Sequence, residues 1–145
     1  MSHSLTKIWL HGIFSTKNRE ALIAENFERQ LYKHVEENLK VRFDIPLKSI
    51  GGYNDHVHLL FLFNQNHSVK DVFHYIKGES SHWINQNEFL NEKFAWQTGY
   101  AAFSVSESML NNVINYIDNQ KIHHKQKSFG EEYDGFIKKY GLELK

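Results

Sequence analysis

The sequence predicts an α+β fold in which strands and helices follow one another in the order βαββαβ, with further helices at the C-terminal end. Two observations predict this class. Some segments are short, either wholly apolar or with alternating apolar and polar residues, and are bounded by turn-forming residues. This pattern is typical of strands. Others are longer and carry apolar residues three and four positions apart, which is typical of amphipathic helices. With 145 residues, 41% of them hydrophobic, the chain is expected to form a single domain over 1–145 with its own core.

The first half of the chain is expected to contain a strand, a helix and two more strands. Residues 5–14 alternate as a strand, with Phe14 on one face and His11 on the other. Residues 21–42 carry an apolar stripe and form a helix, which Pro46 prevents from continuing. The two strands that follow are joined by a tight Asn-Asp turn, and their limits are 47–53 and 56–63.

The second half is expected to contain a helix, the fourth strand and two further helices. Ser68 opens the first of these helices, because Asp71 stands three residues later in a capping-box arrangement. Gly78 inside it is either a weak point or a point of close approach. The remaining elements are the strand 100–105, a helix over about 107–121 and a short amphipathic helix in the tail 126–145.

This order is that of a ferredoxin-like fold, an antiparallel sheet with two helices on one face. The strand 56–63 has apolar side chains on both faces, so the other side of the sheet must be covered as well. The added C-terminal helix over 107–121 is the candidate for this cover, either from the same subunit or from a partner subunit.

The composition limits the possible function classes. The chain has no cysteine, which excludes disulfides and thiolate metal sites. No segment approaches the roughly 20 apolar residues of a membrane span, and the N-terminus lacks the pattern of a secretory signal. A cytoplasmic location is therefore expected.

The overall charge gives no indication of a nucleic-acid partner. Lys plus Arg and Asp plus Glu number 17 each, whereas nucleic-acid binders usually carry a basic excess. Local clusters can replace that excess. The candidate DNA-binding residues form one dense and one smaller basic segment: Lys121, His123, Lys125 and Lys127, and Lys17 and Arg19. Such a segment is also typical of a solvated helix end.

A histidine pair in the strand 56–63 is a candidate metal site. Side chains of a strand alternate, so His56 and His58 point to the same face and can reach one ion. Imidazole suits first-row metals and accepts harder ions when oxygen ligands complete the shell. With ten histidines in the chain, about one such spacing is expected by chance, so two hydrogen-bonded or exposed strand histidines are the alternative. A zinc protease is not supported, because no His-Glu-x-x-His motif occurs.

A tyrosine and a glutamine lie one turn apart on the helix 107–121. The predicted buried stripe of this helix consists of Leu110, Val113, Ile114 and Ile117. At about 100° per residue, Tyr116 and Gln120 lie off this stripe and next to each other. The flank they form offers a phenol nucleophile beside an amide oxygen that can bind a metal. The alternative is a tyrosine that packs its ring and hydrogen-bonds its hydroxyl.

In combination, these segments resemble a known family, the HUH transposases of small insertion sequences that use a single tyrosine, with relatives associated with repetitive extragenic palindromes. The resemblance covers nearly the whole chain, and its segments are specific in combination rather than singly. They are Phe14-Ser15-Thr16-Lys17, Asp55-His56-Val57-His58-Leu59-Leu60, Ser68-Val69, Ile76-Lys77-Gly78, Trp96-Gln97-Thr98-Gly99-Tyr100, Phe103-Ser104-Val105-Ser106, Tyr116-Ile117-Asp118-Asn119-Gln120 and His123-His124.

The resemblance implies a ferredoxin-like fold and a role for each candidate residue. His56 and His58 match the pair that binds a divalent metal, here Mg²⁺ or Mn²⁺. Gln120 matches the third metal ligand, and Tyr116 matches the catalytic nucleophile. The family works as a homodimer in which the tyrosine helix of one subunit can complete the site of the other.

The resemblance also implies the substrate and the reaction. The expected substrate is single-stranded DNA with hairpins near the ends of a mobile element, cleaved and rejoined through a 5′-phosphotyrosine. That bond keeps the energy of the phosphodiester, so no nucleotide cofactor is needed. The sequence agrees with this expectation, because it contains no Gly-rich phosphate loop.

Two other functions stay open from the sequence. Replication initiators and plasmid relaxases share the His-hydrophobic-His strand, but they are commonly parts of larger chains. A non-catalytic ferredoxin-like module that binds nucleic acid, recruited by a host, would keep the fold without the chemistry. Metal-dependent covalent adducts with DNA separate the enzyme from such a module.

Overall fold

A four-stranded antiparallel sheet is the centre of the protein in the computed structural model, which describes residues 4–124 and 127–142. The strands are β1 (Trp9–Ser15), β2 (Leu47–Tyr53), β3 (His56–Leu62) and β4 (Ala101–Val105). Their spatial order is β2-β3-β1-β4, and each neighbouring pair is antiparallel. Together with the chain order βαββαβ, this sheet confirms the predicted ferredoxin-like class.

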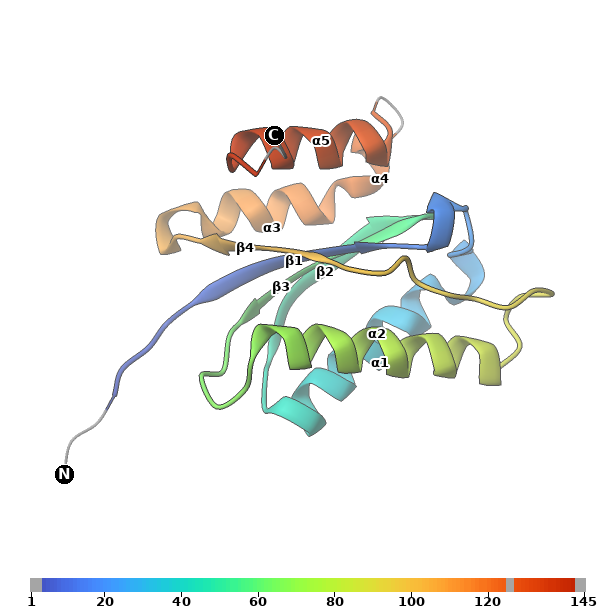
Figure 1. The fold of residues 1–145 in the computed structure, drawn as a ribbon, viewed down its shortest axis with the longest axis horizontal. Helices are drawn as coiled ribbons and strands as arrows, with labels where there is room; N and C mark the ends of the chain where they lie inside the picture. The colour runs from blue at the N-terminus through green and yellow to red at the C-terminus, as the bar shows by residue number, and fades with distance from the viewer. Residues whose placement is uncertain (1–3, 125–126, 143–145) are drawn as a thin grey trace.

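Two long helices cover one face of the sheet (Figure 1). They are α1 (Glu25–Phe43) and α2 (Val69–Gln86). Phe14 of β1 points to this face and packs in the main core with Phe27 of α1 and Phe73 of α2. The alternation of the first strand is therefore as predicted. Among the described residues, no helix has both the length and the apolar character needed to cross a membrane.

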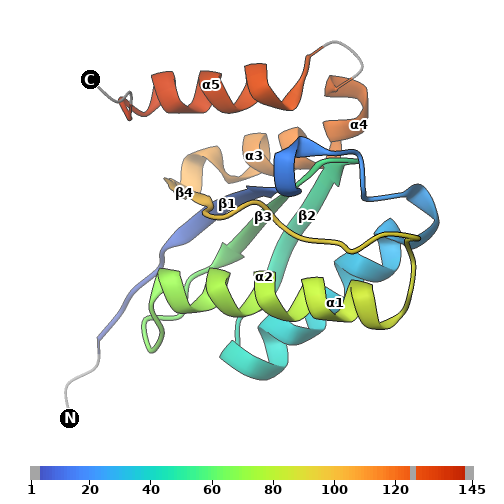
Figure 2. The same cartoon turned by 45° about the vertical axis from the view of Figure 1, so that its right-hand side comes forward.

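Three shorter helices cover the opposite face of the sheet. They are α3 (Leu110–Asp118), α4 (Gln120–His123) and α5 (Phe129–Lys139). Figures 1 and 2 show α3 and α5 on the side of the sheet opposite to α1 and α2. Helix α3 packs on the edge strand β2, whereas α5 lies over β1 and β4 through Phe129 and Phe136, which pack with Phe103. The predicted cover of this face thus comes from the same chain, and the tail helix supplies part of it.

Three of the predicted elements differ in the structure. The helix predicted over 21–42 begins at Glu25 and ends at Phe43. The first strand begins at Trp9 rather than at residue 5. The helix predicted over 107–121 is divided into a 3-10 turn, η2 (Glu107–Met109), followed by α3 and α4. It breaks at Asn119, where φ is −102° and ψ is 18° and the side chain donates to the carbonyl of Asn115. Of the predicted stripe only Ile117 is fully buried, because α3 lies over an edge strand and one of its flanks stays open.

Two glycines differ in the space around them: one allows a close approach of a helix to the sheet, and the other lies in open space. A Cβ added at Gly51 of β2 would lie 2.4 Å from the backbone oxygen of Ile117, so α3 approaches the sheet only because position 51 has no side chain. A Cβ added at Gly78 of α2 would meet no described atom within 4 Å. Gly78 is therefore a weak point of its helix, since glycine costs conformational entropy and no close approach requires it.

Replacing each glycine by alanine separates these two cases. Gly78→Ala is expected to raise the free energy of unfolding by about 0.5–1 kcal/mol, because helix propensity improves in open space. Gly51→Ala is expected to lower it by about 1–3 kcal/mol, because α3 must move away from β2. Urea unfolding of the two variants measures both effects. A loss of stability in Gly78→Ala, or no change in Gly51→Ala, would contradict this packing.

Candidate active site

The two histidines of β3 lie on the face of the sheet that α3 and α5 cover, and both side chains are fully buried. The Nδ1 atom of His56 lies 2.8 Å from a carboxylate oxygen of Asp55. The Nδ1 atom of His58 lies 2.8 Å from Nε2 of His11. Each ring therefore uses Nδ1 for a neighbour and turns Nε2 toward the interior of the site. Histidines that bind metals have this arrangement, because the outer hydrogen bond fixes the orientation of the ring.

His11 of β1 is not among the predicted site residues, yet it stacks on His58 with 5.0 Å between the ring centroids. Burial, together with the neighbouring His58, lowers the pKa of His11 to about 3. Burial also lowers the pKa of His58 to about 4, although the Glu132 carboxylate acts in the opposite direction. Both imidazoles are neutral near neutral pH as a result, and neutral imidazole is the form that binds a metal.

Glu132 of α5 lies against the two inward-facing nitrogens. Its Oε1 atom is 3.0 Å from Nε2 of His58 and 3.5 Å from Nε2 of His56. The ligand atoms of these three residues lie within 4.8 Å of one another, and all three residues are buried. Two imidazoles and a carboxylate in such a group can hold a divalent metal ion.

The Glu132 carboxylate also binds side chains from the tyrosine helix region. The hydroxyl of Tyr116 and the amide Nε2 of Gln120 both donate to Oε2, and Nε2 of His124 lies 3.2 Å from the same oxygen. Burial by itself would raise the pKa of Glu132, but the hydrogen bonds with His124 and His58 outweigh this effect and hold that pKa well below its usual range. A carboxylate that is only 3% exposed requires such a set of partners.

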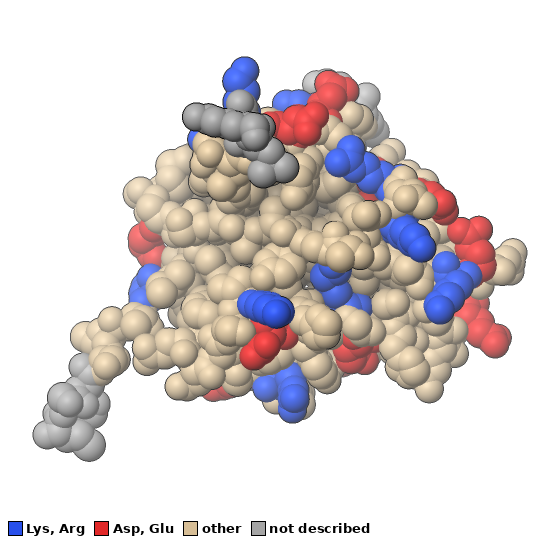
Figure 3. Space-filling model, in the orientation of Figure 1, with Lys and Arg blue, Asp and Glu red and all other residues tan. Residues whose placement is uncertain are grey.

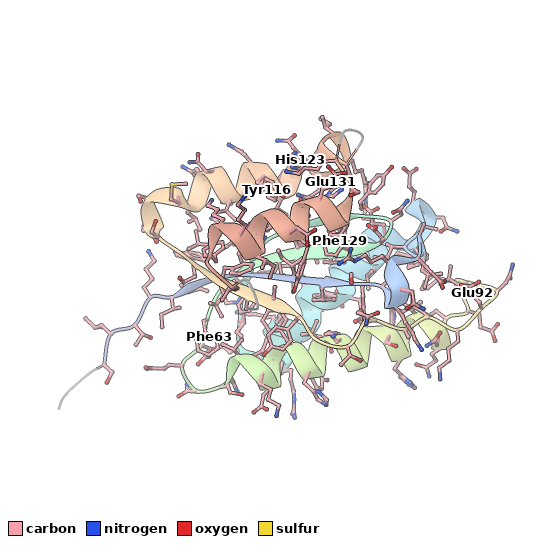
Figure 4. All side chains as sticks on the ribbon, turned by 45° about the horizontal axis from the view of Figure 1, so that its top comes forward. Phe63, Glu92, Tyr116, His123, Phe129 and Glu131 are labelled. Carbon is pink, nitrogen blue, oxygen red and sulfur yellow. The ribbon has the colours of Figure 1, made fainter. Side chains whose placement is uncertain are left out.

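Tyr116 and Gln120 reach this group from opposite sides of the helix break. Gln120 begins α4, and its Oε1 accepts a hydrogen bond of 2.9 Å from Nε2 of His56. The ring of Tyr116 stands edge-on to His58 with 5.6 Å between centroids, and Figure 4 shows Tyr116 between α3 and α5. Burial and the Glu132 carboxylate raise the pKa of the Tyr116 hydroxyl, which is therefore protonated in this arrangement. The structure thus brings the predicted ligands and the predicted nucleophile into one cluster.

The sequence does contain one signal for Glu132. Phe129, Glu132 and Phe136 are spaced as i, i+3 and i+7, so an acidic residue interrupts the apolar stripe of α5. An acidic residue on a buried stripe is rare unless it is paired. Its partners are 74 residues away at His58 and 12 residues away at Gln120, and no local pattern identifies them.

The predicted basic segment that follows the tyrosine helix has mixed surroundings. Nζ of Lys121 pairs with a carboxylate oxygen of Glu28 at 2.8 Å, on the α1 side of the molecule. The ring of His123 packs edge-on against Tyr116 at 5.0 Å, so this residue belongs to the candidate site. Lys127 is exposed ahead of α5, and Lys125 lies outside the described residues.

The smaller predicted basic segment lies at the end of β1. Lys17 and Arg19 are the ends of a 3-10 turn, η1 (Lys17–Arg19). The Arg19 guanidinium stands over the ring of Phe129 at 5.4 Å, and that ring in turn stacks on His56 at 4.3 Å. Arg19 is therefore one aromatic ring away from the candidate metal group.

The two buried histidines make stability depend on pH. Their pKa values in the folded protein, about 4 for His58 and about 3 for His11, lie below the ordinary value of 6.5. The unfolded chain therefore binds more protons, so their contribution is fully present above pH 6.5 and is lost as the pH falls toward 4. Across this window the free energy of unfolding is expected to fall by about 1.4 kcal/mol per pH unit for each histidine.

Urea unfolding of the metal-free protein at a series of pH values checks this expectation. His11→Gln should show a shallower dependence on pH than the unchanged chain. His82→Gln, at an exposed histidine of α2, should leave the dependence as it is. Equal slopes for the unchanged chain and His11→Gln would show that His11 titrates alike in the folded and unfolded states.

Residues 4–120 match the family model described as "Transposase IS200 like", a stretch that runs from ahead of β1 to Gln120. The search of curated proteins gave no match.

Two solved structures share the fold. The crystal structure of a candidate transposase from Deinococcus radiodurans R1 has a TM-score of 0.64 at 23% identity, covering 83% of this chain and 95% of that one. A REP-associated tyrosine transposase bound to a REP hairpin has a TM-score of 0.63 at 14% identity, covering 86% of this chain and 74% of that one. At these identities the likeness concerns the fold alone. The family model, which spans most of the chain, confirms the family that the sequence motifs resemble: the protein belongs to the IS200-like transposases, and its family function is DNA transposition.

Proposed function

We propose that this transposase cleaves and rejoins single-stranded DNA, with Tyr116 as the nucleophile and a divalent metal ion, Mg²⁺ or Mn²⁺, beside it. One observation carries the proposal. The hydroxyl of Tyr116 and the Nε2 atoms of His56 and His58 converge on one buried carboxylate, that of Glu132. A nucleophile and a metal-binding group separated by a single side chain can act on the same phosphate.

The donor set fits a divalent cation. The predicted ligands His56, His58 and Gln120 offer two imidazole nitrogens and an amide oxygen, and Glu132 adds a carboxylate oxygen. Nitrogen and oxygen donors in this combination suit first-row metals and also accept Mg²⁺. The outer hydrogen bonds of both rings keep the Nε2 atoms turned inward, and Nε2 of His56, which donates to Gln120 here, must release its proton before it can bind a cation. Bound there, the cation would supply Lewis-acid stabilisation of the charge that develops on the scissile phosphate.

Tyr116 carries out the bond exchange. Its oxygen attacks phosphorus, the bond between phosphorus and the 3′ oxygen breaks, and a 5′-phosphotyrosine and a free 3′-OH are formed. The phenol loses its proton in this step, and the departing 3′ oxygen gains one. The new bond is again a phosphodiester, so a second 3′-OH can reverse the reaction and join two strands without a nucleotide cofactor.

The arrangement of Glu132 corresponds to a state before substrate binding. Its carboxylate raises the pKa of Tyr116 and accepts the hydrogen bond of the hydroxyl that must react. His56, His58 and Gln120 are each at most 1% exposed, so solvent and phosphate do not reach them here. The Glu132 side chain must therefore give up its contact with Tyr116 before a phosphate can take that place.

We extend the proposal to the form of the substrate and of the enzyme. In this proposal residues 1–145 act as a single nuclease domain, and the substrate is the hairpin-containing end of a mobile element. The hairpin bound to a solved structure of the same fold supports this choice of substrate. The family resemblance favours a homodimer. One chain contributes both histidines, Gln120 and Tyr116 to the cluster, so a dimer is not required to assemble this group.

Loss of the Tyr116 hydroxyl is expected to abolish covalent attachment to DNA. Incubation with Mn²⁺ and labelled single-stranded oligonucleotides from the genomic flanks of the gene should give a protein–DNA adduct on a denaturing gel. Tyr116→Phe should reduce the adduct to background, because the variant lacks the attacking oxygen. Tyr75 packs on Phe43 on the opposite face of the sheet, so Tyr75→Phe should retain the adduct. An adduct that persists in Tyr116→Phe would rule out this nucleophile.

Removal of the paired histidines is expected to remove metal binding. The double variant His56→Ala, His58→Ala should weaken Mn²⁺ binding by more than about 100-fold, since loss of even an outer partner of a metal site costs about 10–100-fold. Glu132→Gln, which keeps the size and removes the charge, should weaken Mn²⁺ binding by about tenfold. Titration of free Mn²⁺ by electron paramagnetic resonance measures affinity without DNA. His82→Ala serves as the control, and equal affinity in the double variant and the unchanged chain would refute the metal assignment.

A further inference from the structure

Two adjoining cavities lie on either side of residues 97–100, outside the cluster around Glu132. The first has a volume of about 560 Å³ and is bounded by the end of β1, by η1 and by the start of α5. The second has a volume of about 410 Å³ and lies against α2. The four residues 97–100 line both cavities and form the wall between them.

The charge around these cavities is of one sign. Arg19 lines the first cavity, and Lys70 and Lys77 line the second, while no Asp or Glu of the described residues lines either. Three other cavities of the described chain each contain at least one carboxylate. In a protein with 17 basic and 17 acidic residues, this is a local excess of positive charge. Figure 3 shows Lys and Arg side chains along the middle of the face that it presents, with most Asp and Glu side chains nearer its edges.

The wall between the cavities is held in place from both sides. Nζ of Lys77 donates to the backbone oxygens of Gln97, at 2.7 Å, and of Gly99. The backbone N–H of Gln97 donates to the oxygen of Ser15 at 2.8 Å, and its side-chain oxygen accepts from the N–H of Asn18 at 3.0 Å. Gly99 has a φ of +93°, which glycine adopts without strain. The wall is therefore a preformed feature rather than a loose loop.

An aromatic side chain at the end of this wall is available for stacking. One side of the Tyr100 ring stacks on Phe73, with 4.4 Å between centroids and 7° between planes. Tyr100 is nevertheless 36% exposed and lines both cavities. A ring fixed on one side and open elsewhere can receive a nucleobase with little loss of conformational entropy.

The first cavity borders the candidate active site. Phe129 lines the cavity and stacks on His56 at 4.3 Å, so a single ring separates the cavity from a candidate metal ligand. Ser15, which also lines the cavity, pairs with His56 across β1 and β3. A strand whose phosphate reaches Tyr116 has neighbouring nucleotides within reach of this cavity.

We propose that the two cavities bind an unpaired nucleotide segment of the DNA strand next to the scissile phosphate. A base enters the first cavity against Tyr100, where the amide of Gln97 faces it, and phosphates contact Arg19 and Lys70. Stacking on an aromatic ring combined with cations for the backbone is the chemistry that recognises single strands. The inference rests on the proposed cleavage of single-stranded DNA, and it assigns the segment that holds the strand.

Binding measured without cleavage tests the assignment. The probe is a fluorescein-labelled oligothymidylate, followed by fluorescence anisotropy, and every protein carries Tyr116→Phe so that no adduct forms. Tyr100→Ala is expected to weaken binding about tenfold, whereas Tyr100→Phe keeps the stacking surface and should bind as before. Lys70→Ala should weaken binding and reduce the slope of log affinity against log salt by about 0.7, the value for one phosphate contact on a single strand. Lys33→Ala, at an exposed lysine of α1 that lines neither cavity, should change neither quantity.

The outcomes separate this inference from the proposed function. Unchanged affinity in Tyr100→Ala and Lys70→Ala, with circular dichroism showing folded protein, would overturn the inference even if the Tyr116 adduct forms. A Lys33→Ala effect equal to that of Lys70→Ala would overturn it as well. If Tyr100→Ala unfolds the chain, Arg19→Ala on the exposed η1 turn takes its place, and unchanged affinity and salt slope in that variant would be equally decisive. If binding depends on the cavity residues but the unchanged chain forms no adduct, the proposed cleavage is refuted and the proposed binding site is retained.

Discussion

A buried carboxylate is stable only when its charge is fully paired, and in this protein that requirement falls on Glu132. Its partners come from β3, α3 and the α4 region, so one side chain ties the tail helix to the sheet and to the tyrosine helix. Removal of a partner would leave this buried charge less fully paired. The same contacts gather two imidazoles, an amide and a phenol around one point, so the stability of the fold and the chemistry proposed for the site depend on the same hydrogen bonds.

The second layer of helices follows from the central strand. Strand β3 is apolar on one face and carries the two histidines on the other, so both faces must be shielded from water. Helix α3 packs mainly on the edge strand β2, with a close approach at Gly51, and leaves part of the second face uncovered. Helix α5 covers the rest through Phe129 and Phe136. The candidate site lies in the seam between these two helices.

The net charge of the protein conceals an uneven distribution of its charged residues. Lys121 is neutralised by Glu28, whereas the basic residues around residues 97–100 have no carboxylate beside them in either cavity. A neutral protein can therefore carry a local excess of positive charge. Of these basic residues, Arg19 stands over Phe129, the ring that stacks on His56.

Local patterns in the sequence determined the order of the elements, the shared face of His56 and His58, the cap at Ser68 and the one-turn spacing of Tyr116 and Gln120. These are consequences of period and spacing, which act over a few residues. Only the tertiary structure decided that Glu132 faces His58 across 74 residues, that His11 supports the same ring from β1, and that the tyrosine helix breaks at Asn119. Those contacts depend on how distant elements pack, and the pairing of a buried charge with partners so far along the chain leaves no periodic trace in the sequence.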